Sequence, residues 1–362
     1  MTDTRTASAP EAETETAAPL DVVRVHPLCA ETPTSVLPLA VTPRESVYVR
    51  SNFEMPLAHD AWELAVRGAV RTPFTLSLRE IAALPMHTVL ATMECAGNWR
   101  LGMDPVPTGE PWKYGAVSTT RWSGVSLAAL LDRAGLHDDA LELLAVGADA
   151  GPRDDAVGEV RFERALPLDV ARHPDTLVAT HMDGVPLTAH HGAPLRLLVP
   201  NWYGMASVKW LTALEVRTTP FTGYFQSKRY VYDVNGTTTP VTRALVKSMI
   251  VQPAPYADSS ADTVVRGWAW SGSGAITNVD VAVNDQWHRA TVGQAASAYA
   301  WTPFELSVSL PPGEVTLRSR ATDASGAVQP ERIVWNALGY GNNAIRPHTV
   351  RAVSGEISGL ES

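Results

Sequence analysis

The chain has 362 residues, 45% of them hydrophobic and 19% charged, which is ordinary for a globular protein and long enough for two domains. The formal net charge of −9 disfavours nucleic-acid binding, because phosphate contacts need clustered Lys and Arg. No stretch approaches the roughly 18 apolar residues of a membrane span, so we expect no membrane insertion. Two cysteines, Cys29 and Cys95, are too few for a disulfide framework, which favours the reducing cytoplasm.

The first residues of the chain, 1–21, are rich in Ala, Thr, Glu and Pro. They contain neither the apolar segment of a secretory signal nor twin arginines. We therefore predict a disordered N-terminal tail that takes no part in the fold.

Residues 22–241 have a mixed pattern that predicts an α+β domain with long functional loops. Strands are expected at Trp62–Val66, Thr88–Cys95 and Pro194–Pro200, and short helices at Ser77–Leu84 and Ser126–Gly135. The run of Leu and Val between Pro194 and Pro200 is typical of a strand buried on both faces.

Residues 242–362 change to short segments with alternate apolar residues, separated by turn-forming sequences. The expected strands are Val264–Trp270, Val279–Val283, Phe304–Val308 and Val315–Ala321. This spacing, without a helical period, predicts an all-β sandwich, and Tyr224–Pro240 is interpreted as the connection between the domains.

Cys95 lies where a predicted strand runs into a small polar turn, Cys95-Ala96-Gly97-Asn98. Ala96 and Gly97 would let the backbone approach a bulky partner, and Arg100 would favour the thiolate. A single thiolate is a soft ligand suited to a heavy transition metal. The alternative is that Cys95 is a small buried hydrophobic residue with no chemistry.

The segment Cys-Ala-Gly-Asn-Trp-Arg, from Cys95 to Arg100, resembles the metal-binding motif of the sulfite oxidase family of mononuclear molybdopterin-dependent oxidoreductases. Four further blocks resemble that family in the same order: Tyr48–Pro56, Trp112–Val125, His191–Arg196 and Gly204–Leu211. The resemblance extends over about residues 22–350. It implies a sulfite-oxidase-type molybdopterin domain followed by an immunoglobulin-like dimerisation domain, and hence a homodimer.

The resemblance implies that the thiolate of Cys95 binds the molybdenum of a molybdopterin cofactor. The residues that match cofactor-binding positions are Asn52, Asp149, His191, Arg196, Ser207 and Lys209. Arg and Lys suit the phosphate of the pterin, because they donate charge-assisted hydrogen bonds. His190 is an equal competitor for the role of His191.

For the substrate, Arg50 and Arg100 match two arginines of the family's oxyanion pocket, and Trp112 matches its tryptophan. Thr180 falls at the place of a pocket tyrosine, and a shift of one residue would bring in His181. The implied reaction is a two-electron oxygen-atom transfer on a small molecule. The sequence has no Cys-x-x-Cys-His haem motif, so no haem is expected, and electrons would pass to or from a separate carrier.

Three departures from the family pattern concern the substrate. Ser51 and Asn52 follow Arg50 where the family usually has Asn and His, Thr180 replaces the tyrosine, and Leu338 replaces an arginine of the β domain. Losing a cation weakens binding of a sulfate-like anion. We therefore hypothesise a less charged substrate and inefficient oxidation of sulfite.

Two other interpretations compete with this one. The chain could be a cofactor-free binding or structural protein with a degenerate molybdopterin domain. It could also be a cysteine-nucleophile enzyme in which His181, His190 or His191 serves as the base for Cys95.

Overall fold

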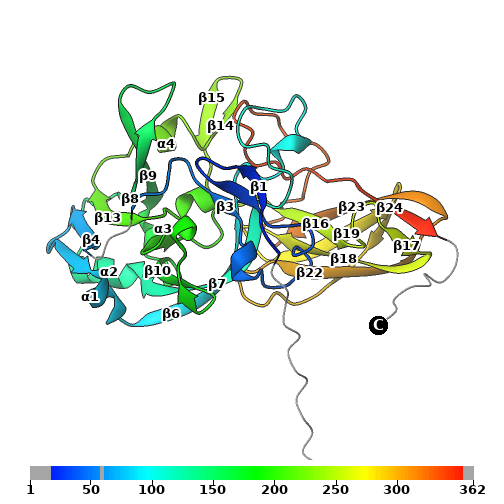
Figure 1. Ribbon diagram of the computed structural model, residues 1–362, viewed down its shortest axis with the longest axis horizontal. Helices are drawn as coiled ribbons and strands as arrows, with labels where there is room; N and C mark the ends of the chain where they lie inside the picture. The colour runs from blue at the N-terminus through cyan, green and yellow to red at the C-terminus, as the bar shows by residue number, and fades with distance from the viewer. Residues whose placement is uncertain (1–17, 58–60, 354–362) are drawn as a thin grey trace, which may run out of the picture.

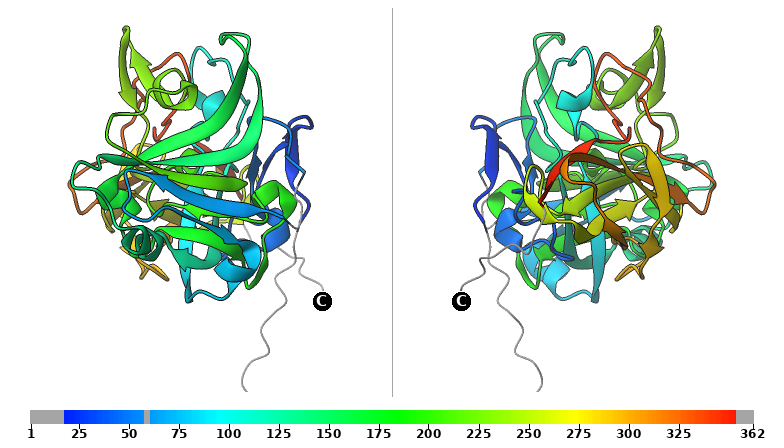
Figure 2. Two further views of the ribbon diagram at one scale, coloured as in Figure 1. Left: turned by 90° about the vertical axis from the view of Figure 1, so that its left-hand side faces the viewer. Right: turned by 90° about the vertical axis from the view of Figure 1, so that its right-hand side faces the viewer.

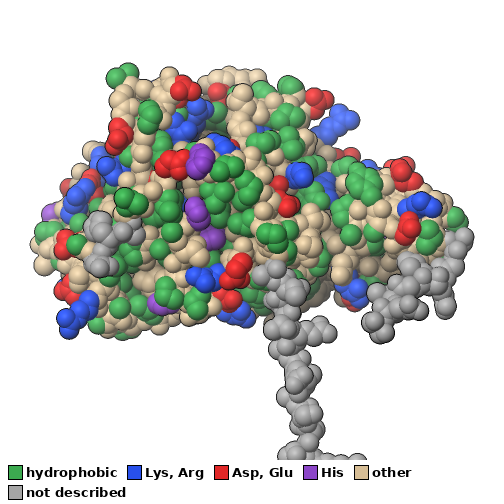
Figure 3. Space-filling view, viewed as in Figure 1, with side chains coloured by type: hydrophobic (Ala, Val, Ile, Leu, Met, Phe, Trp, Pro, Cys, Tyr) green, Lys and Arg blue, Asp and Glu red, His purple; other side chains and the backbone are tan. Residues whose placement is uncertain are grey.

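The computed structural model describes residues 18–57 and 61–353, which form two lobes of mostly β structure (Figure 1). The predicted tail falls largely outside the described residues. Within them, the backbone N–H of Ala18 already donates to Ser46 Oγ, and the first strand begins at Asp21. No helix in the described part of the chain combines the length and hydropathy needed to cross a bilayer. Side chains of both charges are interspersed over the face shown in Figure 3.

The first lobe is built on two five-stranded sheets. One contains β4 (Glu63–Gly68), β5 (Phe74–Ser77), β8 (Glu142–Pro152), β9 (Glu159–Pro167) and β13 (Leu211–Arg217), in the order β5-β4-β13-β8-β9. The other contains β6 (Met86–Glu94), β7 (Val117–Ser126), β10 (Leu177–Met182) and β11 (Val185–Pro186), in the order β11-β10-β7-β6, and β12 (Arg196–Leu198) also pairs with β10. β13 runs parallel to β4, and the other neighbours are antiparallel.

Shorter elements complete this lobe. A three-stranded sheet contains β1 (Asp21–Arg24), β2 (Cys29–Glu31) and β3 (Val49–Arg50), and β14 (Val231–Val234) and β15 (Thr237–Pro240) form a hairpin. The helices are α1 (Leu78–Ala82), α2 (Leu127–Ala134), α3 (Leu168–Ala171) and α4 (Tyr224–Ser227). Short 3₁₀ turns occur at Arg44–Ser46, Arg100–Gly102, Ala189–His191 and Gly204–Ala206.

The second lobe is a sandwich of two sheets. One contains β16 (Lys247–Gln252), β18 (Asp262–Trp270), β21 (Thr291–Val292) and β22 (Thr302–Ser309), in the order β16-β18-β22-β21. The other contains β17 (Asp258–Ser260), β19 (Ile276–Val283), β20 (Gln286–Arg289), β23 (Gly313–Asp323) and β24 (His348–Val353), in the order β17-β24-β23-β19-β20. Along β23 every second residue is buried, because alternate side chains face the core between the sheets.

The expected α+β domain followed by an all-β sandwich is confirmed, and the local signals explain the ends of the helices. Ser77 and Glu80 form a capping box at the start of α1, with Ser77 Oγ accepting from the Glu80 N–H and the Glu80 carboxylate accepting from the Ser77 N–H. After α2, Gly135 adopts a positive φ of 67°.

The segment Tyr224–Pro240, which we interpreted as the connection between the domains, has secondary structure of its own. It folds into α4 and the β14–β15 hairpin, and it places Phe225 and Tyr230 in the core. The aromatic side chains explain this, because a solvent-exposed linker would not bury them.

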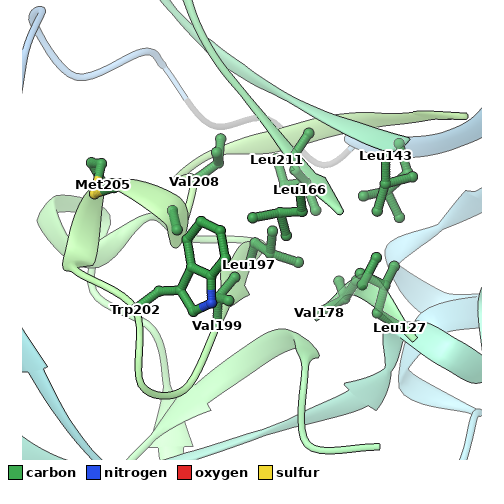
Figure 4. Close-up of a cluster of buried hydrophobic side chains, with 14 of the residues drawn as sticks. Leu127, Leu143, Leu166, Val178, Leu197, Val199, Trp202, Met205, Val208 and Leu211 are labelled. Atoms are coloured by element: carbon green, nitrogen blue, oxygen red, sulfur yellow. The ribbon is translucent and has the colours of Figure 1, made fainter. Parts of the chain in front are cut away.

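The core of the first lobe lies between its two sheets. Figure 4 shows Leu143, Leu166 and Leu211 from the first sheet close to Val178 and Leu197 from the second. All five side chains are nearly or completely inaccessible to solvent. This packing holds the second sheet, and hence the end of β6, against the rest of the lobe.

The two lobes are joined by buried polar contacts as well as by packing. Trp268 Nε1 and Trp301 Nε1 of the sandwich donate to the carbonyls of Leu37 and Ala40, at 2.8 Å each. The loop after Arg100 and the segment 330–345 lie beside the β14–β15 hairpin in both views of Figure 2, and Trp335 Nε1 donates to the Pro105 carbonyl at 2.8 Å. Segments from both lobes also meet at the turn that follows β6, where the Gly341 N–H donates to the Ala96 carbonyl at 2.7 Å.

Candidate active site

Cys95 follows the last residue of β6, a strand that is paired along its whole length with β7. Its backbone N–H donates to the Ala116 carbonyl at 2.9 Å, and its own carbonyl accepts from the Asn98 N–H at 2.9 Å. The side chain is buried, with 7% exposure. A long strand pair and a closed turn thus fix the position of the sulfur.

Two cavities meet at Cys95. The inner cavity has an empty volume of about 730 Å³ and the outer cavity about 840 Å³. The residues that line both are Arg50, Asn52, Cys95 and Tyr230. Cys95 therefore presents its sulfur to two spaces, as a metal ligand between a cofactor and a substrate would.

The inner cavity is lined by the expected cofactor residues Asn52, Asp149, His191, Arg196, Ser207 and Lys209. Arg196 is 4% exposed and donates to the carbonyls of His191 (3.0 Å) and Ser207 (3.2 Å). Its guanidinium lies over the Trp122 ring, 4.6 Å from the ring centroid. Burial lowers the pKa of Arg196 to about 10, and its Nε is buried without a hydrogen-bond partner among the described residues.

Besides Arg196, the ionisable side chains of Lys209 and Asp149 line this cavity. Lys209 Nζ donates to Ser51 Oγ and to the His190 carbonyl, each at 2.8 Å. Burial, and then the charge of Arg196, lower the pKa of Lys209 to about 7. Burial raises the pKa of Asp149 to about 6, and Asp149 Oδ1 has no hydrogen-bond partner among the described residues.

The two neighbouring histidines differ in their freedom to bind a ligand. His191 has 6% exposure, and both of its ring nitrogens are engaged: Nε2 lies 3.1 Å from the Val47 carbonyl and Nδ1 lies 2.6 Å from Thr188 Oγ1. Nε2 must carry the proton, because a carbonyl can only accept. The His190 ring also lines the cavity, and none of the described residues hydrogen-bonds to it. His190 is therefore the freer of the two donors.

Five arginines line the outer cavity: Arg24, Arg50, Arg100, Arg153 and Arg229. Only Arg50 and Arg100 were singled out from the sequence. The other three stand outside the matched blocks, and β1, the β8–β9 loop and the segment after α4 bring them to the same place. Leu338 also lines the cavity, as expected, but the cavity keeps a strongly cationic wall.

Arg100 is 4% exposed and donates to the carbonyls of Glu110 (2.7 Å) and Leu338 (3.2 Å). Glycines crowd its guanidinium: a Cβ at Gly97 would lie 2.5 Å from Nη2, and a Cβ at Gly339 would lie 2.6 Å from Nε. The expectation that Gly97 makes room for a bulky partner is therefore refined, because the group it accommodates is Arg100 itself.

Asn52 and Trp112 contribute differently to the outer cavity. Asn52 Oδ1 accepts from Arg50 (2.9 Å) and Arg153 (3.2 Å), and its Nδ2 donates to the hydroxyl of Tyr230 (3.1 Å). Trp112 is fully buried, and its Nε1 has no hydrogen-bond partner among the described residues. Asn52 thus joins two arginines to the tyrosine at the boundary of the cavities.

The structure does not place Thr180 or His181 at either cavity. Thr180 lies on β10, where its Oγ1 is 3.7 Å from Met86 Sδ and 2.8 Å from His181 Nδ1. The tyrosine at the site is Tyr230, which lines both cavities and stacks on Tyr340 with the ring centroids 5.2 Å apart. Neither of the two residues that the sequence offered for the tyrosine's place, Thr180 or His181, therefore lines a cavity at Cys95.

Burial raises the pKa of Cys95, and the nearby charges of Arg50 and then Arg100 oppose that rise. The expected effect of Arg100 has the right sign but is outweighed. No described histidine hydrogen-bonds to the sulfur, which disfavours the nucleophile interpretation. A coordinated metal would remove the proton outright.

The residues around the inner cavity fit the phosphate of a molybdopterin. Arg196 Nε is a buried donor without a partner among the described residues, and Arg196 and Lys209 are cations whose burial disfavours their charge. A phosphate would compensate both charges. The donor set around this cavity therefore suits an anionic group that reaches Cys95.

Comparison with known proteins decides the family. Residues 52–225 match the family described as "Oxidoreductase molybdopterin binding domain", and residues 237–351 match "Mo-co oxidoreductase dimerisation domain". The chain is 33% identical to sulfite oxidase of Gallus gallus over 86% of its own length and 74% of that protein. It belongs to the sulfite oxidase family.

Two further similarities agree with this assignment. The mitochondrial sulfite oxidase of Drosophila melanogaster is 32% identical over 91% of this chain and 62% of that protein. The sulfane dehydrogenase SoxCD of Paracoccus pantotrophus superposes with a TM-score of 0.82 and 26% identity, covering 96% of this chain and 93% of that one. The chain spans 62–63% of the fly, rat and mouse enzymes that it matches.

Proposed function

We propose that the protein is a molybdopterin-dependent oxidoreductase that carries out a two-electron oxygen-atom transfer on a small anionic molecule. Electrons would pass to or from a separate carrier, and the second domain would form a homodimer. The observation that supports this most is the position of Cys95 between a cavity suited to a phosphate-bearing cofactor and a cavity lined by five arginines.

The residues of the chain would divide the work between the two cavities. Arg196, Lys209 and His190 would hold the pterin phosphate, and Cys95 would bind the molybdenum. The bound group supplies the redox chemistry of oxygen transfer. Arg50 and Arg100 would orient the substrate anion, since fixed cations in a partly buried site bind anions with little reorganisation.

Among the relatives, sulfite oxidases and a sulfane dehydrogenase act on sulfur compounds, so sulfur oxyanions are the first substrates to test. Leu338 supplies one apolar wall, so we expect kcat/KM for sulfite to fall well below the diffusion limit of about 10⁸ M⁻¹ s⁻¹. The cytoplasm is our prediction for the location, because Cys29 and Cys95 are both free thiols.

The test is a steady-state assay of protein purified from a host that makes the pterin, with an artificial electron carrier. We expect turnover of a small anion in a panel of sulfite, nitrate and neutral sulfoxides and N-oxides. Arg100→Gln should lower kcat/KM for that anion by about 100-fold, from the loss of charge-assisted bonds. A preference for a neutral substrate, with no effect of Arg100→Gln, would contradict the proposal.

A further inference from the structure

One carboxylate stands among the five arginines of the outer cavity. Of the described residues that line this cavity, Glu110 is the only acidic one. Its side chain is 11% exposed, and Oε1 lies 3.0 Å from Arg24 Nη1 and 3.4 Å from Arg50 Nη2. Part of the positive charge that an anionic substrate would meet is therefore already compensated by the protein.

The backbone holds Glu110 firmly in this place. Its carbonyl accepts from Arg100 Nη1 at 2.7 Å and from the Trp112 N–H at 2.8 Å. It follows Gly109, whose φ of +131° suits glycine and whose Cβ, if present, would lie 2.9 Å from the Arg100 guanidinium carbon. The carboxylate is thus part of a built site and not a mobile surface group.

Only some of the five arginines that line the outer cavity are paired with a carboxylate. Arg229 is paired with Asp155 (3.0 Å), while Arg24 and Arg50 share Glu110. Arg100 and Arg153 have no carboxylate within 4 Å among the described residues, and the Nε of each is buried without a hydrogen-bond partner. Burial and the charge of Arg50 also lower the pKa of Arg153, which an anion would relieve.

The uncompensated charge therefore belongs to Arg100 and Arg153, whereas the compensated Arg50 lines the boundary with the inner cavity next to Cys95. Arg100 and Arg153 line the same cavity as the Glu110 carboxylate, so an anion bound there meets two uncompensated cations and one fixed negative charge. Each further negative charge on the ligand adds to its repulsion by Glu110, and like charges repel strongly in a partly buried site.

We propose that Glu110 is a specificity-determining residue that makes the outer cavity select monoanions over dianions of the same size. The proposal names the substrate class and rests on the proposed function only in assigning the outer cavity to the substrate. It also gives a physical reason, besides Leu338, for poor use of the sulfite dianion.

The test compares two non-reacting tetrahedral anions of similar size, sulfate as the dianion and methanesulfonate as the monoanion. Isothermal titration calorimetry of the purified, cofactor-loaded protein gives both dissociation constants. Glu110→Gln keeps an oxygen that accepts from Arg24 and Arg50 but removes the charge. Asp138→Asn is the matched control, because it removes one exposed carboxylate that pairs with Arg71, which lines neither cavity.

We expect the wild type to bind methanesulfonate more tightly than sulfate. Glu110→Gln should tighten sulfate by at least about tenfold and methanesulfonate by about threefold, because the removed repulsion scales with the charge of the ligand. The control should leave the ratio of the two constants unchanged.

The proposal is overturned if Glu110→Gln leaves that ratio within twofold of the wild type. It is also overturned if both anions bind more weakly, as a purely structural role for Glu110 would require, or if neither binds. Calorimetry needs no turnover. A failure of the anion test therefore leaves the proposed function to be judged by metal content and activity, which are measured separately on the same protein.

Discussion

At the scale of single residues, the candidate site is assembled from side chains that are far apart in the sequence. The motif residues Cys95 and Arg100 could be singled out from the sequence because they lie five positions apart in one recognisable block. Arg24 on β1 and Arg153 in the β8–β9 loop could not, since an isolated arginine carries no local signal. Only the tertiary fold brings them within one cavity.

Gly339 gives a test of how closely Arg100 is enclosed. Its φ is +65°, and a Cβ there would lie 2.6 Å from Arg100 Nε. Gly339→Ala should displace the guanidinium and lower kcat/KM for the anionic substrate by about 10–100-fold, as misplacement of a positioning group does. The matched control is Gly326→Ala, which has a similar φ of +86° but no atom within 4 Å of the new Cβ. Equal losses in both variants would show that backbone strain alone is responsible.

The buried ring of His191 should lower the free energy of unfolding at acidic pH. Burial, and then the charge of Arg196, lower its pKa to about 3, so the folded protein disfavours the protonated ring. The unfolded chain binds this proton from about pH 6.5 downward, and therefore the free energy of unfolding should fall as the pH drops from 6.5 towards 3. Urea denaturation of the wild type and His191→Gln at pH 7, 6 and 5 measures the difference. Parallel curves for the two proteins would rule out this role.

At the scale of elements, the strand that ends at Cys95 is tied to the second lobe by a buried ion pair. Lys247 Nζ on β16 lies 2.7 Å from Glu94 Oε1, with side-chain exposures of 7% and 1%. Asn98 Nδ2 and Trp270 Nε1 also donate to this carboxylate, each at 2.9 Å. Glu94, the residue before the proposed metal ligand Cys95, therefore takes its partners from both lobes.

Removing Lys247 should be costly, because it leaves a buried carboxylate without its cation. We expect Lys247→Met to lower the free energy of unfolding by about 3–5 kcal/mol. The double variant Glu94→Gln/Lys247→Met should recover a large part of that loss, since it removes both charges. Chemical denaturation of the wild type, both single variants and the double variant completes the cycle, and simple additivity would argue against a coupled pair.

The elements themselves were largely predictable. The alternation along β23, the capping box of α1 and the glycine after α2 are local signals, and the structure places strands and helices where these signals lie. Tyr224–Pro240 was interpreted only as a connection, and the helix and hairpin that it forms were not predicted. Thr180 and its neighbour His181 both lie on β10, and neither lines a cavity at Cys95, so a shift of one residue along this strand would not have found the site.

At the scale of the whole molecule, the second lobe is expected to join two chains. Residues 237–351 match a dimerisation domain. Sedimentation equilibrium of the intact protein should therefore give twice the mass of one chain. A mass of one chain across the micromolar range would remove the dimer from the account.

The central claim is that the sulfur of Cys95 is a ligand of molybdenum in a pterin cofactor. X-ray absorption at the molybdenum edge of the purified protein tests it most directly, because it counts the sulfur neighbours of the metal. We expect Cys95→Ser to show one sulfur neighbour of molybdenum fewer than the wild type. An unchanged sulfur count in the variant, or protein without molybdenum, would contradict it.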